Sequence, residues 1–154
     1  MCRITRLSPA HLPEILEIER ESFSDAWSEG MFAGLMASPH TFGFVAENPD
    51  KPDNPDKTGG IAGYIMFNLI TSAPQEMQIL NIAVRKSARN QQIGSLLLKS
   101  ALGCAPISRA TLEVRESNTP AISLYKKVGF KTDGARKNYY TRPKENAILM
   151  SLEI

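Results

Sequence analysis

The segment that most constrains this chain is residues 79–102, which read ILNIAVRKSARNQQIGSLLLKSAL. The first six residues, Ile79 to Val84, are almost wholly apolar, as is typical of a strand buried on both faces of a sheet. A basic, amide-rich turn follows, and Gly94 stands where an apolar helix begins. The free N–H groups and the dipole at a helix start favour anions. The turn is therefore a candidate phosphate or pyrophosphate site, with an ordinary strand–helix connection as the equal alternative.

Length and composition predict one domain over residues 1–154. The chain has 154 residues, of which 42% are hydrophobic and 22% charged, so it can bury a core and is not disordered. Lys and Arg number 18 against 16 acidic residues, and a net charge of +2 is too small for general nucleic-acid binding. No apolar run approaches the roughly 18 residues of a membrane helix. We expect a soluble, cytoplasmic protein that binds neither nucleic acid nor membrane.

The two cysteines and two histidines do not form a recognisable site. Cys2 and Cys104 lie far apart, without a CxxC pair or partner histidines, so neither a zinc site nor a disulfide framework is indicated. His11 and His40 are not near a candidate nucleophile, which argues against Ser–His or Cys–His catalysis. The chain also lacks the GxxxxGK[ST], HExxH, GxSxG and GxGxxG motifs. We therefore expect no metal and no covalent triad.

Periodicity and capping residues predict a mixed α/β sheet with hairpin-like strands in the first half and helix-connected parallel strands in the second. Strands are expected at 3–7, 42–47, 61–70, 79–84, 110–115, 130–133 and 147–153. Helices are expected at 9–22, 28–38, 94–103 and 119–129. Pro13 favours a later regular start for the first helix. Residues 48–60 carry three prolines and two glycines, so we expect a long, mobile hairpin loop of no functional weight there.

A second candidate region is residues 111–130, TLEVRESNTPAISLYKKVGF. Strand alternation puts Glu113 and Arg115 on one face, opposite Leu112 and Val114. A carboxylate near the end of such a strand can accept a proton from a ligand, and a surface pair with Arg115 is the alternative. Asn118 or Thr119 is expected to cap the next helix. By composition alone, Tyr125 is more often a core aromatic than a proton donor.

Taken together, LNIAVRKSARNQQIGSLLLKSAL, LEVRESNTPAISLYKKVGF and ARKNYY resemble the GNAT superfamily of N-acetyltransferases. The likeness is greatest to the ribosomal-protein-alanine N-acetyltransferase family (RimI type). It covers nearly the whole chain, including DAWSEGMF at 25–32, and is strongest over 79–140. The resemblance implies a mixed, mostly antiparallel sheet of about six or seven strands with a splayed central parallel pair, flanked by about four helices.

The resemblance also implies a site for acetyl-coenzyme A. Main-chain groups of Ile82, Ala83 and Val84 would hold the pantetheine arm and the acetyl carbonyl, and Asn118 would contact the same arm. Glu113 would be the general base, through water, and Tyr125 the general acid that protonates the departing thiolate. The pyrophosphate would be wrapped by the turn residues Arg89, Asn90, Gln91, Gln92, Ile93, Gly94 and Ser95.

For the acceptor, the resemblance implies a protein N-terminus held between the first two helices and the loop joining the last strands. Tyrosine hydroxyls and aromatic faces suit a peptide backbone. The alternative is structural, with Trp27 stapling its helix and one tyrosine in the core. The residues concerned are Trp27, Phe32, Asn138, Tyr139 and Tyr140.

One residue departs from the superfamily turn, which reads R/Q-x-x-G-x-G/A. Here Gln92 stands in place of the first glycine. Glycine lets the backbone approach phosphate closely and tolerates positive φ, whereas Gln92 must keep ordinary angles or accept strain of about 1–3 kcal/mol. We expect acetyl-coenzyme A binding that is retained but weakened.

The function that this resemblance implies is transfer of an acetyl group from acetyl-coenzyme A to the N-terminal α-amine of a protein, with a ribosomal protein as a candidate acceptor. We expect a monomer or weak dimer. Two alternatives remain open: acetylation of a small amine or a lysine side chain, and a non-catalytic acyl-coenzyme A binding module.

Overall fold

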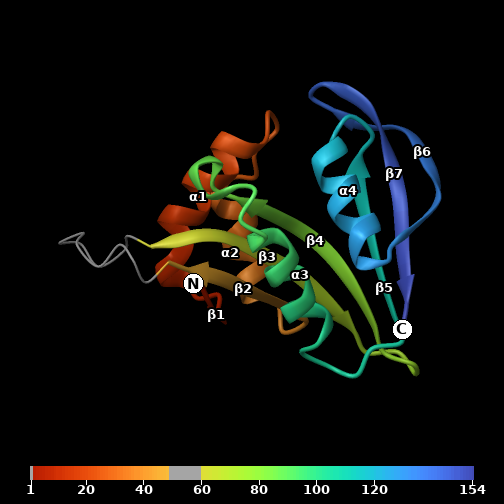
Figure 1. Ribbon diagram of the computed structural model, residues 1–154, viewed down its shortest axis with the longest axis horizontal. Coiled ribbons are helices and arrows are strands. Elements are labelled where there is room, and N and C mark those ends of the chain that lie inside the picture. Colours follow the sequence, from red (N-terminus) through yellow and green to blue (C-terminus); the bar gives the residue numbers. More distant parts are fainter. Residues whose placement is uncertain (1, 49–59) are drawn as a thin grey trace.

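A seven-stranded mixed sheet with helices on both faces forms the protein (Figure 1). The computed structural model describes residues 2–48 and 60–154. The strand order is β1-β2-β3-β4-β5-β7-β6, and β4 and β5 form the one parallel pair of this described sheet. The strands are β1 (Arg3–Arg6), β2 (Thr41–Glu47), β3 (Ile61–Ile70), β4 (Glu76–Val84), β5 (Arg109–Arg115), β6 (Lys131–Thr141) and β7 (Lys144–Glu153). The fold class expected from the resemblance is confirmed.

Residues with capping chemistry begin and end the helices. Ser28 accepts a hydrogen bond from the Met31 N–H and begins α2, and Asn118 accepts one from Ala121 and begins α4. Gly129, at φ 120°, ends α4 in a conformation that glycine readily adopts. The elements are η1 (Pro9–His11), α1 (Leu12–Ser22), α2 (Glu29–Ala37), η2 (Lys86–Ala88), α3 (Ile93–Leu102) and α4 (Thr119–Val128). No helix in the described residues is long and apolar enough to cross a bilayer.

The first expected helix is divided into a short 3₁₀ turn, Pro9–His11, and the α-helix that starts at Leu12. The later start follows from Pro13, which is tolerated in the first turn of a helix but not in its interior. The expected loop at 48–60 falls mostly on residues 49–59, which lie outside the described residues. Its ends meet, because the Asn48 N–H donates to the Gly60 carbonyl and Glu47 pairs with Ile61.

The second half of the sheet differs from what the sequence pattern predicts. Helix-connected parallel strands were expected there, but β7 lies between β5 and β6 and is antiparallel to both. The expectation of a parallel second half is therefore wrong. The sixth strand also runs from Lys131 to Thr141, well past the expected 130–133, because it forms a long hairpin with β7. Such a pairing depends on a distant partner, which local periodicity cannot identify.

The parallel pair is short and then opens. β4 and β5 pair over three positions that end at Gln78 and Thr111. Two residues later the register between β3 and β4 shifts, with Met66 opposite Asn81 and Phe67 opposite Ile79, so Leu80 is an extra, bulged residue. A bulge bends its strand and increases its twist. The bend turns the rest of β4 away from β5, and Figure 1 shows the two strands together at one end and apart at the other.

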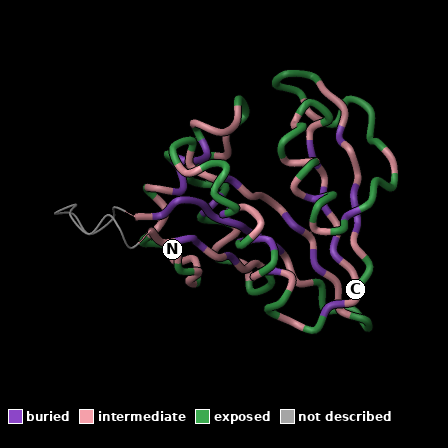
Figure 2. Tube along the Cα trace, in the orientation of Figure 1, coloured by how far each residue is buried: buried purple, intermediate pink, exposed green. Residues whose placement is uncertain are grey.

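The core consists of two apolar clusters, one on each face of the sheet. Helices α1 and α2 cover the cluster that includes Ile15, Ile18, Phe32 and Tyr64. Helices α3 and α4 contribute Leu97, Leu98 and Tyr125 to the other cluster. Figure 2 shows buried backbone running along the central strands, with exposed residues in the connections. Strand 79–84 is less enclosed than a doubly covered strand should be, because Leu80 to Ile82 face the opening beside β5 and are half-buried.

Candidate active site

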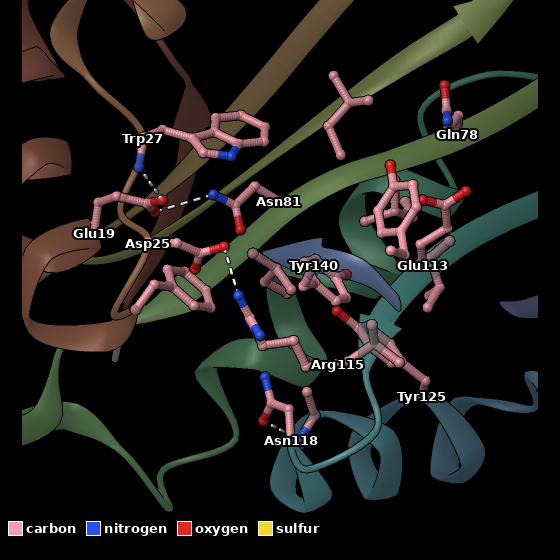
Figure 3. A pocket seen from close by; sticks show the side chains of 18 residues that line it. Glu19, Asp25, Trp27, Gln78, Asn81, Glu113, Arg115, Asn118, Tyr125 and Tyr140 are labelled. Atoms are coloured by element: carbon pink, nitrogen blue, oxygen red, sulfur yellow. Dashed lines mark hydrogen bonds and ion pairs between the residues drawn. The ribbon is translucent and has the colours of Figure 1, made fainter. Parts of the chain in front are cut away.

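Two cavities meet where β4 and β5 separate. The first, of about 370 Å³, lies between the two strands and is called the β4–β5 cavity here (Figure 3). The second, of about 660 Å³, lies against the turn before α3 and is called the turn cavity. Residues Phe23, Ile82, Asn118 and Ala121 line both. The cavities therefore adjoin, so a long ligand on the turn lies next to the opening between the strands.

Glu113 projects from the middle of β5 into the β4–β5 cavity, on the strand face opposite the buried Leu112 and Val114. The alternative, a surface pair with Arg115, does not form. Instead the carboxylate lies 3.5 Å from the Arg136 guanidinium (Oε1 to Nη1), and its interaction with the Tyr139 side chain raises the pKa of Tyr139. With a quarter of its side chain exposed, Glu113 can exchange protons with a bound molecule or water.

Tyr125 lines the same cavity from α4. It is 5% exposed, and its ring packs at a tilt against Phe130, with the centroids 5.8 Å apart. Burial, followed by repulsion from Tyr140, raises the pKa of Tyr125 well above that of a free tyrosine. The phenol therefore keeps its proton at neutral pH. Such a group can donate that proton to a leaving thiolate in the cavity.

Tyr139 and Tyr140 line the β4–β5 cavity and belong to strand β6. The resemblance had implied that they would lie in a loop joining the last strands. Their rings meet edge to face at 5.0 Å. Burial raises the pKa of Tyr140 to about 12, and the Arg115 guanidinium lies 4.2 Å from the centroid of its ring. Tyr139, nearly half exposed, faces Arg136 at 5.3 Å. Both tyrosines present aromatic surface and a protonated hydroxyl.

Arg115 connects the two sides of the opening. Its Nη2 lies 2.7 Å from Oδ2 of Asp25 in the segment between α1 and α2, and its Nη1 lies 3.2 Å from Oε2 of Glu145 on β7. Nη1 and Nη2 also donate to the carbonyls of Pro143 and Arg142. Burial lowers the pKa of Arg115, but the hydrogen bonds and charges of Asp25 and Glu145 together outweigh it, so the pKa is raised. The α1–α2 segment is thereby held against the β6–β7 hairpin.

A second polar cluster lies at the other end of the cavity. Glu19, on α1, is 1% exposed and accepts hydrogen bonds from the Trp27 N–H (3.0 Å), the Asn81 amide (3.0 Å) and the Tyr64 hydroxyl. Burial raises the pKa of Glu19, and the hydrogen bonds from Trp27, Tyr64 and Asn81 oppose that rise. Trp27 and Asn81 face the cavity beside it. Figure 3 shows this cluster well separated from Glu113 and Tyr125.

The turn cavity contains most of the residues expected to hold a cofactor. Its walls include the end of β4 and the first turn of α3, whose N–H groups have no partner within the helix. Arg89 does not reach into open space, because it donates to the Val84 carbonyl (3.1 Å) and the Ser22 hydroxyl (3.2 Å). The expected residues that line it are Ile82, Ala83, Val84, Arg89, Asn90, Gln92, Ile93, Gly94, Ser95 and Asn118.

Of the two conformations considered for Gln92, ordinary angles or a strained positive φ, the residue adopts the positive φ. It caps α3 in the left-handed region, at φ 61° and ψ 16°, and Asn90 has a similar φ of 62°. A left-handed conformation costs a residue with a side chain about 1–2 kcal/mol, less for asparagine, which hydrogen-bonds locally. The turn thus keeps the backbone shape that a glycine would adopt freely, and the conformational strain lies at Gln92.

Asn118 lies where the two cavities join. Its Oδ1 accepts from the Ala121 N–H at 3.3 Å and caps α4, so the side-chain NH₂ is the donor that can serve a ligand. Three other expected residues are not part of either wall. Phe32 is fully buried, 5.4 Å from the Trp27 ring, and Gln91 and Asn138 line neither cavity. Phe32 therefore supports Trp27 from behind.

The cavity residues that sequence reasoning missed include Glu19, Asp25 and Asn81. Glu19 carried a signal that was overlooked, because it lies four residues after Ile15 on the apolar stripe of α1. A charge on such a stripe is buried and must find partners. Asp25 and Asn81 carried no comparable local signal. Among the described residues there is no cluster of His, Cys, Asp and Glu that could hold a metal ion.

Comparison with known proteins identifies the family. Residues 12–130 match the model of the acetyltransferase (GNAT) family. A Bacillus subtilis protein, provisionally named a ribosomal protein bS18-alanine N-acetyltransferase, is 35% identical over 147 residues, covering 93% of this chain and 89% of that protein. The crystal structure of the ribosomal-protein-S18-alanine N-acetyltransferase from Escherichia coli has a TM-score of 0.84 at 30% identity, covering 100% of this chain and 94% of the other.

A more distant structure shares the fold. Arabidopsis thaliana NAA60, crystallised in complex with acetyl-CoA, has a TM-score of 0.87 at 17% identity, over 100% of this chain and 99% of that one. The match to the family model and the full-length identity to the bacterial relatives agree with the splayed sheet and its two adjoining cavities. The chain belongs to the GNAT family of N-acetyltransferases.

Proposed function

We propose that this protein transfers the acetyl group of acetyl-coenzyme A to the N-terminal α-amine of a protein, with a ribosomal protein as the first candidate. The observation that carries the proposal is the position of Glu113 and Tyr125. Both line one cavity, and that cavity adjoins a second one at the anion-favouring start of α3. A base, a proton donor and a phosphate site thus lie in neighbouring cavities.

The turn cavity fits the coenzyme. Its volume of about 660 Å³ is in the range of ligand sites, and the first turn of α3 offers N–H groups to a pyrophosphate. The end of β4 is released from β5, so the main-chain groups of Ile82 to Val84 that do not bond to β3 can serve the pantetheine arm and the thioester carbonyl. Asn118 adds an amide donor at the junction. Acetyl-coenzyme A supplies an activated acyl group with a thiol as leaving group.

The proposed chemistry needs three proton movements. Glu113 removes a proton from the α-ammonium, directly or through water, so that the neutral amine can attack the thioester carbon. A C–N bond then forms, the nitrogen gives up a second proton, which can return through water to Tyr125, and the C–S bond breaks. Tyr125 donates its proton to the sulfur as it leaves, which the raised pKa of this buried phenol supports. Aromatic surface from Trp27, Tyr139 and Tyr140 can pack on the first residues of the acceptor.

A protein N-terminus is favoured over a small amine by the relatives, whose names specify an alanine of ribosomal protein bS18. The lining of the opening agrees with this, since aromatic side chains from both halves of the sheet border it. We accordingly expect a protein acceptor and a cytoplasmic location.

The test is thiol release from acetyl-coenzyme A with panels of N-terminal peptides, N-terminally blocked lysine peptides and free polyamines. We expect turnover of N-terminal peptides, with the acetyl group located on the α-amine by fragmentation mass spectrometry. Turnover of polyamines or lysine peptides alone would show that the acceptor is not a protein N-terminus but belongs to that other class. No turnover on any panel would favour a binding module.

The assigned roles are tested by Glu113→Gln and Tyr125→Phe, each of which removes one proton-transfer group. General acid–base groups contribute about 10²–10⁴-fold to rate, so kcat should fall by at least about tenfold in each variant while acetyl-coenzyme A still binds. Glu116→Gln is the matched control, because Glu116 is exposed just beyond the end of β5 and lines neither cavity. Unchanged kcat in both test variants would refute these roles.

A further inference from the structure

Glu19 is a fully buried carboxylate that the proposed chemistry does not use. It lies on α1, yet its partners come from three other parts of the chain. Oε1 accepts from the main-chain N–H of Trp27 between α1 and α2, and Oε2 accepts from the side chains of Tyr64 on β3 and Asn81 on β4. The Asn81 amide also donates to the Tyr64 hydroxyl at 3.1 Å. One carboxylate thus joins α1, the α1–α2 segment, β3 and β4.

These contacts indicate a structural role for Glu19 rather than a role as a second general base. Three donors already converge on its two oxygens, so little capacity remains for an incoming proton carrier. Figure 3 also shows it separated from Glu113 and Tyr125 across the cavity. A buried carboxylate costs folding energy unless it is fully hydrogen-bonded, and here the cost is offset by bonds at one end of the cavity.

The carboxylate fixes the end of the β4–β5 cavity that Trp27 and Asn81 line, which is where the acceptor would enter. Trp27 lines that cavity, and its ring packs on Phe32, which in turn meets Tyr64 edge to face at 5.9 Å. Asn81 lines it as well and directly precedes Ile82, which borders both cavities. The position of Trp27 relative to β4 therefore depends on Glu19 through the main chain of Trp27 and the side chain of Asn81.

We propose that Glu19 is a positioning residue for the acceptor, which fixes the Trp27 main chain against Asn81 and so sets the width of the cavity entrance for a peptide N-terminus. This inference rests on the proposed function. It assigns Glu19 no contact with the reacting atoms, and it predicts an effect on acceptor binding that is separate from the binding of acetyl-coenzyme A.

The first experiment replaces Glu19 by glutamine, which keeps the size of the side chain but presents an NH₂ to groups that are themselves donors. A lost charge-assisted hydrogen bond corresponds to about a tenfold change. We expect KM for an acceptor peptide to rise about tenfold, with kcat and KM for acetyl-coenzyme A within about threefold of the wild type. Glu17→Gln on the exposed side of the same helix is the matched control, since Glu17 is 60% exposed and pairs with Arg85.

Tyr64→Phe provides a second variant that does not alter the cavity wall. Tyr64 is fully buried and does not line either cavity, so removal of its hydroxyl can affect the acceptor through Glu19 and Asn81. We expect a smaller rise in peptide KM in the same direction. Far-UV circular dichroism and a thermal melt of each variant establish that the folded protein is being assayed.

Trp27 gives a readout that does not require turnover, because it is the chain's one tryptophan. Release of its main chain should increase acrylamide quenching of its fluorescence in Glu19→Gln and Tyr64→Phe, but not in Glu17→Gln. If quenching changes while the wild type acetylates no peptide, the proposed function fails and the link from Glu19 to Trp27 stands. Wild-type quenching and peptide KM in Glu19→Gln, or an equal rise of both KM values, would overturn the proposal.

Discussion

The Arg115 guanidinium lies 2.7 Å from the Asp25 carboxylate, and this ion pair joins β5 to the α1–α2 segment across the opening of the sheet. The two residues are 90 positions apart in the chain. Arg115 is 12% exposed and also binds Glu145, whereas Asp25 is 34% exposed. The pair therefore closes one side of the β4–β5 cavity, beside the ring of Tyr140, which the Arg115 guanidinium also contacts.

Replacing Arg115 by lysine should loosen this closure, because a single ammonium cannot reproduce the fork that contacts Asp25, Glu145 and two carbonyls. We expect the free energy of unfolding to fall by about 2 kcal/mol in urea denaturation, and KM for an acceptor peptide to rise several-fold. Arg3→Lys is the control, since Arg3 is 75% exposed and its pair with Glu47 should contribute under about 1 kcal/mol. Equal losses in the two variants would contradict the prediction.

Gln92→Gly should strengthen the binding of acetyl-coenzyme A. At φ 61° glycine removes the strain on the turn and the Cβ that limits its approach to phosphate. Because glycine also gains entropy in the unfolded chain, the unfolding free energy should change by less than about 1 kcal/mol. Titration calorimetry should show a Kd lower by a few-fold.

Two variants control for the Gln92 experiment. Gln92→Asn keeps an amide side chain that tolerates the left-handed region, and Gln91→Gly adds a glycine at a neighbouring position that does not line the turn cavity. Gln91→Gly should not improve the affinity. Tighter binding by the wild type than by Gln92→Gly would show that the Gln92 side chain itself contributes to the coenzyme site.

Gly63→Ala should damage both stability and the coenzyme site. A Cβ at Gly63 would lie 2.7 Å from the Ala83 carbonyl oxygen and 3.2 Å from a Leu97 methyl, so β4 must shift. Overpacking of this kind costs about 1–3 kcal/mol. We expect that loss in chemical denaturation, together with a raised KM for acetyl-coenzyme A, because Ala83 belongs to the released end of β4.

Gly34→Ala is the matched control for Gly63→Ala. A Cβ at Gly34, in the exposed middle of α2, meets nothing within 4 Å. Alanine should therefore stabilise the helix by about 0.5–1 kcal/mol and leave the kinetics unchanged. Destabilisation by Gly34→Ala to the same degree as by Gly63→Ala would remove the steric explanation.

Protonation of Glu145 should lower the free energy of unfolding in acid. Hydrogen bonds from Ser117, whose N–H lies 2.6 Å from Oε1, and then the Arg115 guanidinium lower the pKa of Glu145 from its ordinary value of 4.5. The folded state therefore favours the ionised carboxylate. Its stabilising contribution is fully present above pH 4.5 and is lost as the pH falls through the lower, folded pKa.

Glu145→Gln should flatten the fall in unfolding free energy below pH 4.5, as measured by urea denaturation at a series of pH values. The exposed Glu116→Gln variant should follow the wild-type curve. If Glu145→Gln also follows it, the hydrogen bonds to Glu145 do not differ in strength between its two protonation states.

Local sequence patterns predicted the elements that carry the site. The apolar run at 79–84 became the end of β4, and Asn118, Pro120 and Gly129 defined α4. Capping and periodicity depend on neighbouring residues, so they can be read without a structure. The order of LEVR, SN, LY and NYY then indicated the family, and with it the fold and the acetyl-transfer chemistry.

Tertiary structure decided what lies between these elements. The antiparallel insertion of β7, the bulge at Leu80, the Arg115–Asp25 pair and the buried Glu19 all depend on partners far away in the chain. A period of two or 3.6 residues determines which face of an element is apolar, but not which distant side chain will meet it. The sequence therefore determined the strands, the helices and the family, whereas folding determined the width and the walls of the cavity between β4 and β5.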